Sequence, residues 1–343
     1  MLKTSNSLLN HNVAKLELFQ SGEVDPITTG IPVLDEALLG GLLPSSIVGI
    51  VARSGHGKTF DLEIIEDHII NNHPDTIIVN CNWEMTFFKL LVRRLTHKLN
   101  ISPKRVLFDL LKESELATEY REIIESFNKD NVLYQNEPVD ADTFFKDIET
   151  IIDSNPNKRI VVLIDNLENV LRVGGSQKEC MDKLLYKINV LKNRHPFISF
   201  VILNQMNGNY LNRTDQSINH FPRETDIYGT EQLFKICDVV YFKIMPWKLG
   251  IKNKFLHFLT DAFPDFEEYK VSSTTKYTGF EPVGNVFRIV SKQRLSEDLL
   301  EDNLIDIEKV FEKRISGDDL DIDIPNLDLP TSNLEDSGDD IPF

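Results

Sequence analysis

The chain has 343 residues, of which 41% are hydrophobic, and its formal net charge is −17. This length and apolar content suit one large or two ordinary domains, and no apolar run approaches the ~20 residues that cross a bilayer. Three widely separated cysteines argue against a disulfide framework or a zinc site. The first residues lack the apolar core of a signal peptide, so we expect a cytoplasmic protein with no membrane partner.

The negative charge is concentrated at the C-terminus. Residues Asp318–Phe343 hold nine acidic side chains and no Lys or Arg, so removing this segment from the total of −17 leaves −8. Pro, Ser and Gly are interspersed among the acidic residues, and this composition predicts a disordered acidic tail over residues 317–343. Because the rest of the chain is only mildly acidic, the overall charge does not exclude nucleic acid as a partner.

From residue 26 onward, strand-like and helix-like stretches alternate, which predicts an α/β fold with a mostly parallel central sheet. The predicted strands are Ile47–Ala52, Thr76–Cys81, Asn131–Tyr134, Arg159–Asp165, Ile198–Asn204, Asp238–Ile244, Phe255–Thr260 and Asn285–Ser291. The predicted helices are Lys58–Asn71, Met85–Leu99, Ala141–Ile152 and Gln177–Lys192. We expect a short N-terminal arm or linker at residues 1–25, one α/β domain at residues 26–316, and the tail.

The most specific motif is a glycine-rich loop between a predicted strand and a predicted helix, Ala52-Arg53-Ser54-Gly55-His56-Gly57-Lys58-Thr59. Small residues let successive backbone N–H groups converge on phosphate oxygens, and the helix N-terminus adds partial positive charge. Lys58 can reach the β- and γ-phosphates of a nucleoside triphosphate, and the Thr59 hydroxyl can hold Mg²⁺. The loop is therefore a P-loop for ATP, with binding contacts expected from Ser54, Gly55, His56, Gly57, Lys58, Thr59 and Phe60.

Three polar residues follow other predicted strands. Asp165 ends the apolar run Ile160–Ile164 and is predicted to hold Mg²⁺, although an acid there can also cap a helix. Glu84 can act as general base for the attacking water, or equally as a first-turn glutamate that favours the helix macrodipole. Gln205 follows the strand Ile198–Asn204, where it can sense the γ-phosphate or lie solvated in a loop.

Taken in order, these segments resemble the RecA-like ATPase domain of DnaB-like replicative helicases. The likeness covers roughly residues 27–295 and begins before the P-loop with Thr28-Thr29-Gly30-Ile31-Pro32-Val33-Leu34-Asp35 and Gly40-Gly41-Leu42. It continues through Asn82-Trp83-Glu84-Met85, Leu163-Ile164-Asp165-Asn166, Leu203-Asn204-Gln205-Met206-Asn207 and Val290-Ser291-Lys292-Gln293-Arg294. Many ATPases share the P-loop alone, whereas this ordered set is much more specific.

The resemblance implies a RecA-like core that binds ATP and Mg²⁺ and works as a homo-oligomeric ring, with a hexamer expected. It implies that Lys292 and Arg294 reach across the subunit interface to the neighbour's γ-phosphate, with Arg294 as the finger. The family's Gly-rich segment after the finger is replaced here by Leu295-Ser296-Glu297-Asp298. No N-terminal helical domain precedes the core, so we expect a short form of the phage or plasmid kind, acting in the host cytoplasm if it is phage-encoded.

Two loops are candidates for contact with single-stranded DNA. In RecA-like rings the loops beside the nucleotide usually face the central channel, which here points to Leu171–Lys178, with Arg172 and Lys178, and Asn207–Arg223, with Arg213. A few cations and backbone N–H groups can follow phosphates without reading bases. The density of basic residues is low, and a flexible solvated loop is equally compatible with the sequence.

The last five residues, Asp339-Asp340-Ile341-Pro342-Phe343, resemble the acidic tip of bacterial single-stranded-DNA-binding proteins, which docks replication partners. An aromatic ring with a free α-carboxylate can enter an apolar pocket rimmed by Lys or Arg. We therefore expect replication proteins to dock on this tip. The alternatives are a solubilising tail and a tail that competes with DNA for the channel.

The sequence thus predicts an ATP-dependent DNA helicase of the DnaB-like type that translocates on single-stranded DNA in replication. A RecA- or RadA-like recombination ATPase would have the same core but form open filaments, for which Ser5–Gln20 is a weak candidate polymerisation element. The third class is a nucleotide-binding replication adaptor that recruits partners through its C-terminal tail.

Overall fold

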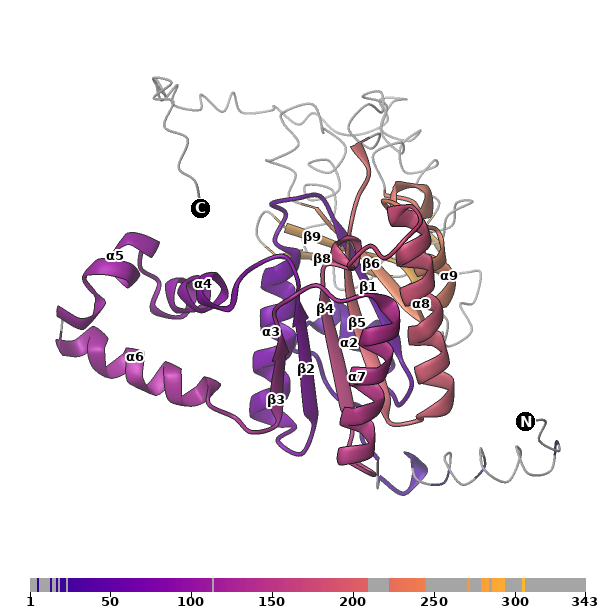
Figure 1. Ribbon diagram of the computed structural model, residues 1–343, viewed down its shortest axis with the longest axis horizontal. Helices are drawn as coiled ribbons and strands as arrows, with labels where there is room; N and C mark the ends of the chain where they lie inside the picture. Colours follow the sequence, from indigo (N-terminus) through magenta and orange to yellow (C-terminus); the bar gives the residue numbers. More distant parts are fainter. Residues whose placement is uncertain are drawn as a thin grey trace, which may run out of the picture. The chain divides into compact units, whose positions relative to one another are not determined.

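The computed structural model describes residues 24–112, 114–208 and 222–244, the strand residues 270–271, 279–283, 286–293 and 304–305, and a few residues before position 23. Its main sheet has eight strands in the order β3-β2-β4-β5-β1-β6-β9-β8 (Figure 1). The six strands from β3 to β6 in this order run parallel, and β9 and β8 extend the sheet in antiparallel fashion. In the described part of the chain, no helix is both long and apolar enough to cross a membrane.

The strands confirm the α/β prediction: β1 to β6 and β9 have ends within two residues of the expected ones, whereas β7, β8 and β10 were not predicted. The parallel strands are β1 (Ile47–Ala52), β2 (Ile77–Asn82), β3 (Val132–Gln135), β4 (Ile160–Asp165), β5 (Ile198–Gln205) and β6 (Val239–Ile244). The antiparallel strands are β8 (Gly279–Val283) and β9 (Val286–Gln293), and a separate small sheet pairs β7 (Lys270–Val271) with β10 (Leu304–Ile305). The expected strand Phe255–Thr260 lies outside the described residues.

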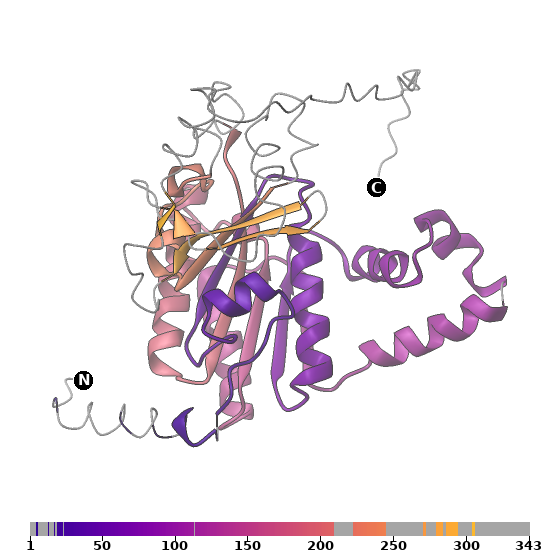
Figure 2. The same cartoon turned by 180° about the vertical axis from the view of Figure 1, so that it is seen from behind.

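Helices cover both faces of the sheet, as Figures 1 and 2 show from opposite sides. One face carries α2 (Pro32–Ala37) and α3 (Lys58–Asn72), and the other carries α7 (Ala141–Ser154), α8 (Gln177–Arg194) and α9 (Gln232–Ile236). Local sequence explains where two of them start. The Asp140 side chain accepts the first free N–H groups of α7, and Ser176 and Glu179 form a capping box at the start of α8.

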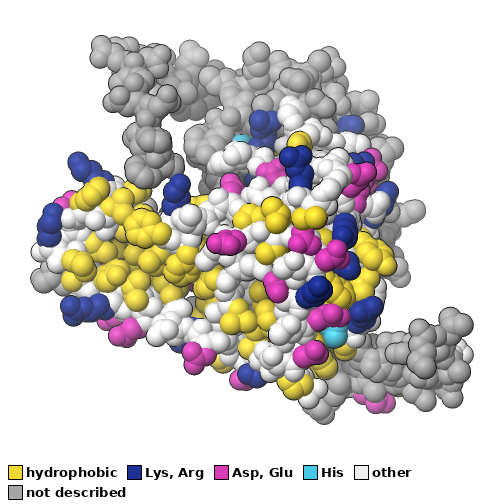
Figure 3. All heavy atoms as spheres, in the orientation of Figure 1, with side chains coloured by type: hydrophobic (Ala, Val, Ile, Leu, Met, Phe, Trp, Pro, Cys, Tyr) yellow, Lys and Arg dark blue, Asp and Glu magenta, His cyan; other side chains and the backbone are white. Residues whose placement is uncertain are grey.

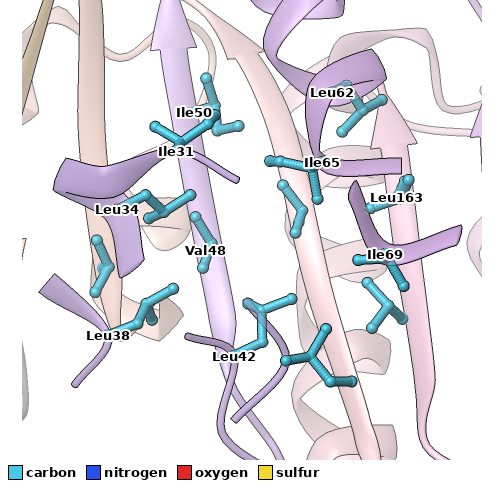
Figure 4. Close-up of a cluster of buried hydrophobic side chains, with 14 of the residues drawn as sticks. Ile31, Leu34, Leu38, Leu42, Val48, Ile50, Leu62, Ile65, Ile69 and Leu163 are labelled. Carbon is cyan, nitrogen blue, oxygen red and sulfur yellow. The ribbon is translucent and has the colours of Figure 1, made fainter. Parts of the chain in front are cut away.

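The core between α2, α3 and the sheet explains why β1 is apolar along its length. Val48 and Ile50 of β1 point to the face where Leu34 of α2 and Ile65 of α3 lie, and all four side chains are fully buried (Figure 4). Each such side chain contributes about 1.5–3 kcal/mol through removal from water. Every residue of β1 is buried, as expected for a central strand covered on both faces.

A helical arm connects β2 to β3 and projects from the sheet in Figure 1. It consists of α4 (Phe87–Leu99), α5 (Pro103–Phe108), a short 3₁₀-helix Leu110–Lys112 and α6 (Ser114–Phe127). Only α4 was expected from the sequence. Large apolar side chains of the arm are exposed, and Figure 3 shows an apolar surface over these helices; the most exposed are Phe88 (62%), Phe108 (66%) and Leu111 (71%).

A buried ion pair fastens the arm to the domain. Glu66 of α3 and Arg94 of α4 are 0% and 4% exposed, and Arg94 donates hydrogen bonds to both carboxylate oxygens of Glu66, one of them at 3.1 Å. The Tyr134 hydroxyl and the Asn80 amide donate to the same carboxylate. Burial lowers the pKa of Arg94, but the Glu66 carboxylate outweighs it, so the pKa of Arg94 is raised overall.

We predict that Arg94→Met lowers the free energy of unfolding by about 3–5 kcal/mol, because it leaves the buried Glu66 charge without its cation. Lys98→Met on the same helix is the control: Lys98 pairs with Asp67 at 3.0 Å, with both side chains about 30% exposed. Such a pair is worth at most about 1 kcal/mol. Urea unfolding measures both changes, and similar losses from the two substitutions would contradict the prediction.

Candidate nucleotide site

Four parallel strands end at one edge of the sheet, and this brings most of the predicted site residues together. Ala52, the last residue of β1, pairs with Gln205, the last residue of β5. Asn82 of β2 pairs with Asp165 of β4 in the same way. Because the carboxyl ends of parallel strands share one edge, their following loops form a common crevice.

The P-loop leaves β1 in a tight turn and enters α3. The His56 N–H donates to the Arg53 carbonyl at 3.1 Å, and Gly55 and Gly57 have φ values of +75° and +79°. Glycine adopts this left-handed region without the steric cost of a Cβ atom. Gly57 is the N-cap of α3, so the first N–H groups of the helix are available to an anion.

Lys58 is buried and its side chain folds back along the loop. Its Nζ donates to the carbonyls of Ala52 at 3.2 Å and Arg53 at 3.5 Å. Burial lowers the pKa of Lys58, while three surrounding carboxylates, those of Glu84, Asp165 and Glu168, act to raise it. The lysine is therefore the cation at the centre of an acidic cluster.

Asp165 has the features expected of a metal-binding carboxylate. It is 0% exposed, and neither carboxylate oxygen has a hydrogen-bond partner at normal geometry in the described part of the chain. Burial raises the pKa of Asp165 to about 6, while the nearby Thr59 hydroxyl acts to lower it. A buried carboxylate with free lone pairs beside a hydroxyl fits a hard cation such as Mg²⁺.

The described residues contain no group of three or more His, Cys, Asp and Glu side chains that could hold a metal by themselves. P-loop chemistry does not require such a group, because Mg²⁺ there takes its remaining ligands from water and from the nucleotide phosphates. Thr59 and Asp165 are the residues of this chain that would hold the ion, and it would neutralise charge on the phosphate oxygens.

Backbone hydrogen bonds hold Glu84 next to Asp165. The N–H groups of Trp83 and Glu84 donate to the Asp165 carbonyl at 2.6 and 3.3 Å. The helix α4 begins only at Phe87, with Thr86 as its N-cap, two residues later than the expected start at Met85. Glu84 therefore precedes the helix instead of occupying its first turn, and its exposed side chain is close enough to raise the pKa of Asp165.

The structure places Gln205 in a hydrogen-bonded position rather than in a solvated loop. Its side-chain amide donates to the Glu168 carboxylate, and its carbonyl accepts the Tyr228 N–H at 2.8 Å. Glu168 lies in a short 3₁₀-helix, Leu167–Asn169, directly after β4. Sequence reasoning missed Glu168, for which the available signal was an acid three residues after Asp165. Burial raises the pKa of Glu168, and Lys58 acts to lower it.

The basic residues that were predicted to contact DNA or a neighbour's nucleotide lie on different elements of the chain. Arg172 is exposed in the loop before α8, and Lys178 lies in the first turn of α8, within the predicted helix Gln177–Lys192 and at the end of the predicted loop. Lys292 lies in β9, the outer antiparallel neighbour of β6. Arg213, Arg294 and the tip Asp339–Phe343 are outside the described residues.

Comparisons with solved structures agree with this architecture. The ATPase domain of G40P matches with a TM-score of 0.61 and 15% sequence identity, over 84% of this chain and 92% of that one. A DnaB-like replicative helicase, in a structure described with its interactions with primase, matches with a TM-score of 0.58 and 16% identity, over 86% of this chain and 62% of that one. At these identities the matches establish the fold.

Among curated proteins, no sequence matches the chain significantly. The family model described as "DnaB-like helicase C terminal domain" matches residues 26–247, a region that holds the P-loop and the ends of β2, β4 and β5. Since this match spans more than half of the 343 residues, the chain belongs to the family of DnaB-like helicase C-terminal domains, which is a family of nucleotide-binding P-loop ATPases.

Proposed function

We propose that this chain hydrolyses Mg-ATP and uses the free energy to unwind DNA as a DnaB-like replicative helicase, assembled as a hexameric ring on single-stranded DNA. The observation that carries the proposal is the convergence of Lys58, Asp165, Glu84 and Gln205 from four strand ends onto one P-loop, in a chain of this family.

In this proposal the N–H groups of the P-loop and the Lys58 ammonium bind the phosphates, and Thr59 and Asp165 hold Mg²⁺. Glu84 accepts a proton from the water that attacks the γ-phosphorus, as the bond from phosphorus to the bridging oxygen breaks. Gln205 exchanges its Glu168 partner for a γ-phosphate oxygen. Its carbonyl bond to the Tyr228 N–H then transmits the change to the segment after β5.

The direction of β9 supports a ring in which neighbouring subunits complete each site. Arg288 pairs with Lys243, which in turn pairs with Ala52 at the start of the P-loop. Lys292 pairs with Val240, which lies three residues before Lys243, about 10 Å away along β6 and toward the amino-terminal ends of the parallel strands. The end of β9 is thus far from the chain's own P-loop, as expected if Lys292 and Arg294 act on a neighbour's nucleotide.

The proposed function also includes binding to other replication proteins. One of the related structures is described with its interactions with primase. We propose that this chain also recruits replication proteins, with the tip Asp339–Phe343 as the docking segment, because a terminal Phe carboxylate preceded by acidic residues can enter a basic-rimmed apolar pocket.

The first test is displacement of a labelled strand from a forked duplex with Mg-ATP. We expect the wild type to displace the strand and Lys58→Ala to lose hydrolysis and displacement by at least about 100-fold, since the substitution removes the cation that contacts the transferred phosphoryl group. Wild-type hydrolysis without displacement would contradict the helicase proposal and favour a recombinase or a loader-dependent assembly.

A second prediction separates activity from stability at Asp165. At pH 8, without Mg²⁺ or nucleotide, Asp165→Asn should raise Tm by roughly 2–6 °C although it abolishes hydrolysis, because it removes a negative charge that burial disfavours. The pKa of Asp165 is raised from 3.8 to about 6, so the folded state loses stability as pH rises through this window. The Tm gain should therefore shrink below pH 6. A Tm loss at pH 8 would contradict the prediction.

A third prediction concerns DNA. The double substitution of Arg172 and Lys178 by Gln should remove DNA-stimulated hydrolysis while leaving Mg-ATP binding unchanged. If both contact phosphates, the slope of log affinity against log salt should fall by about 1.4, since each single-strand phosphate contact contributes about 0.7. The control replaces Lys183 and Lys187, which lie further along α8 and pair with Asp142. Unchanged stimulation in the Arg172 and Lys178 variant would exclude this surface as the DNA contact.

A further inference from the structure

The first turn of α3 contacts a buried ion cluster that is separate from the acidic cluster around Lys58. Asp61 of α3 is 0% exposed, and one oxygen of its carboxylate accepts hydrogen bonds from Lys243 of β6 at 2.6 Å and from Arg288 of β9 at 2.9 Å. The Tyr241 hydroxyl donates to the second oxygen at 2.7 Å. The cluster thus joins the helix that follows the P-loop to two strands.

Two buried cations share this single carboxylate. Lys243 and Arg288 are 1% and 6% exposed, and both contact the carboxylate of Asp61. Burial lowers the pKa of Lys243, and Asp61 acts to raise it.

Lys243 makes a second contact, and it is with the P-loop itself. Its Nζ donates to the Gly57 carbonyl at 2.9 Å. The same oxygen accepts the helical hydrogen bond from the Asp61 N–H at the longer distance of 3.3 Å. Lys243 also pairs with Ala52 in the sheet, so the lysine projects from the strand directly beside the start of the loop. The Lys243 side chain therefore contacts the P-loop from the side that faces the core.

The Gly57 carbonyl and the Lys58 N–H belong to one peptide plane. In a trans peptide these two groups point in opposite directions, so an ammonium that fixes the carbonyl on the core side also fixes the N–H on the other side. That side is the N-terminus of α3, where a phosphate would bind. A cation on the carbonyl oxygen also polarises the peptide and makes its N–H a stronger donor.

We propose that Lys243 is a positioning residue for the P-loop: it orients and polarises the Gly57–Lys58 peptide so that the Lys58 N–H is presented to a nucleotide phosphate. Asp61 holds the lysine in place. The inference rests on the proposed nucleotide site, but it does not depend on helicase activity.

The test compares two substitutions that each remove one cation and leave Asp61 paired with the other, Lys243→Met and Arg288→Met. Both should lower Tm to a similar extent. We expect Lys243→Met to weaken binding of fluorescently labelled Mg-ADP about tenfold, the value of one charge-assisted hydrogen bond, and Arg288→Met to change it less than about twofold. Lys243→Arg, which keeps a cation at this position, should retain most of the wild-type affinity.

Two results would overturn the inference: an unchanged affinity in Lys243→Met, or equal losses in Lys243→Met and Arg288→Met, which would mean that the cluster acts only through stability. Because ADP binding requires neither hydrolysis nor a ring, this comparison is separate from the strand-displacement assay. Failure of Lys243→Met to weaken binding would leave the helicase proposal intact. Failure of the wild type to displace DNA would leave the role of Lys243 intact.

Discussion

The structure depends on one constraint, the burial of the parallel strands on both faces. β1 and β4 are buried along their whole length, so charged side chains can approach a ligand only where these strands end. Asp165 occupies the last position of β4, and the P-loop begins directly after β1. The raised pKa of Asp165 is the consequence of this placement, because the carboxylate lies at the limit of the apolar interior.

The charges around the P-loop are separated in a way that suits a metal–phosphate complex. On one side lie the carboxylates of Asp165, Glu84 and Glu168, which act to raise the pKa of Lys58. On the core side of the same loop, the cations of Lys243 and Arg288 pair with Asp61. A divalent cation complements the acidic side, while the peptide N–H groups above the basic side complement phosphate oxygens. The P-loop therefore has negatively charged side chains on one side and positively charged side chains on the other.

The helical arm connects stability with the site. Its first helix, α4, begins three residues after Glu84, and the pair of Arg94 with Glu66 fixes this helix against α3, the same helix that follows the P-loop. Asp165 holds the intervening turn through the N–H groups of Trp83 and Glu84. The position of Glu84 is thus determined from both ends, by the sheet edge and by the anchored helix. This arrangement fixes the backbone of Glu84, although its side chain is exposed.

The sequence by itself determined the elements whose signals are local: the apolar runs of β1 and β4, the glycines of the P-loop, and the start of α8 at Gln177. The arm helices α5 and α6 escaped prediction because α5 is only six residues long and many apolar residues of the arm remain exposed.

Only the tertiary structure decided which distant residues meet. Gln205 contacts Glu168 across 37 positions, and Lys243 contacts Gly57 across 186. A lysine within the apolar run of β6 was the sequence signal for the second contact, but its partner depends on strand order and register. Those are set by packing and hydrogen bonding across the whole sheet, which no local pattern encodes.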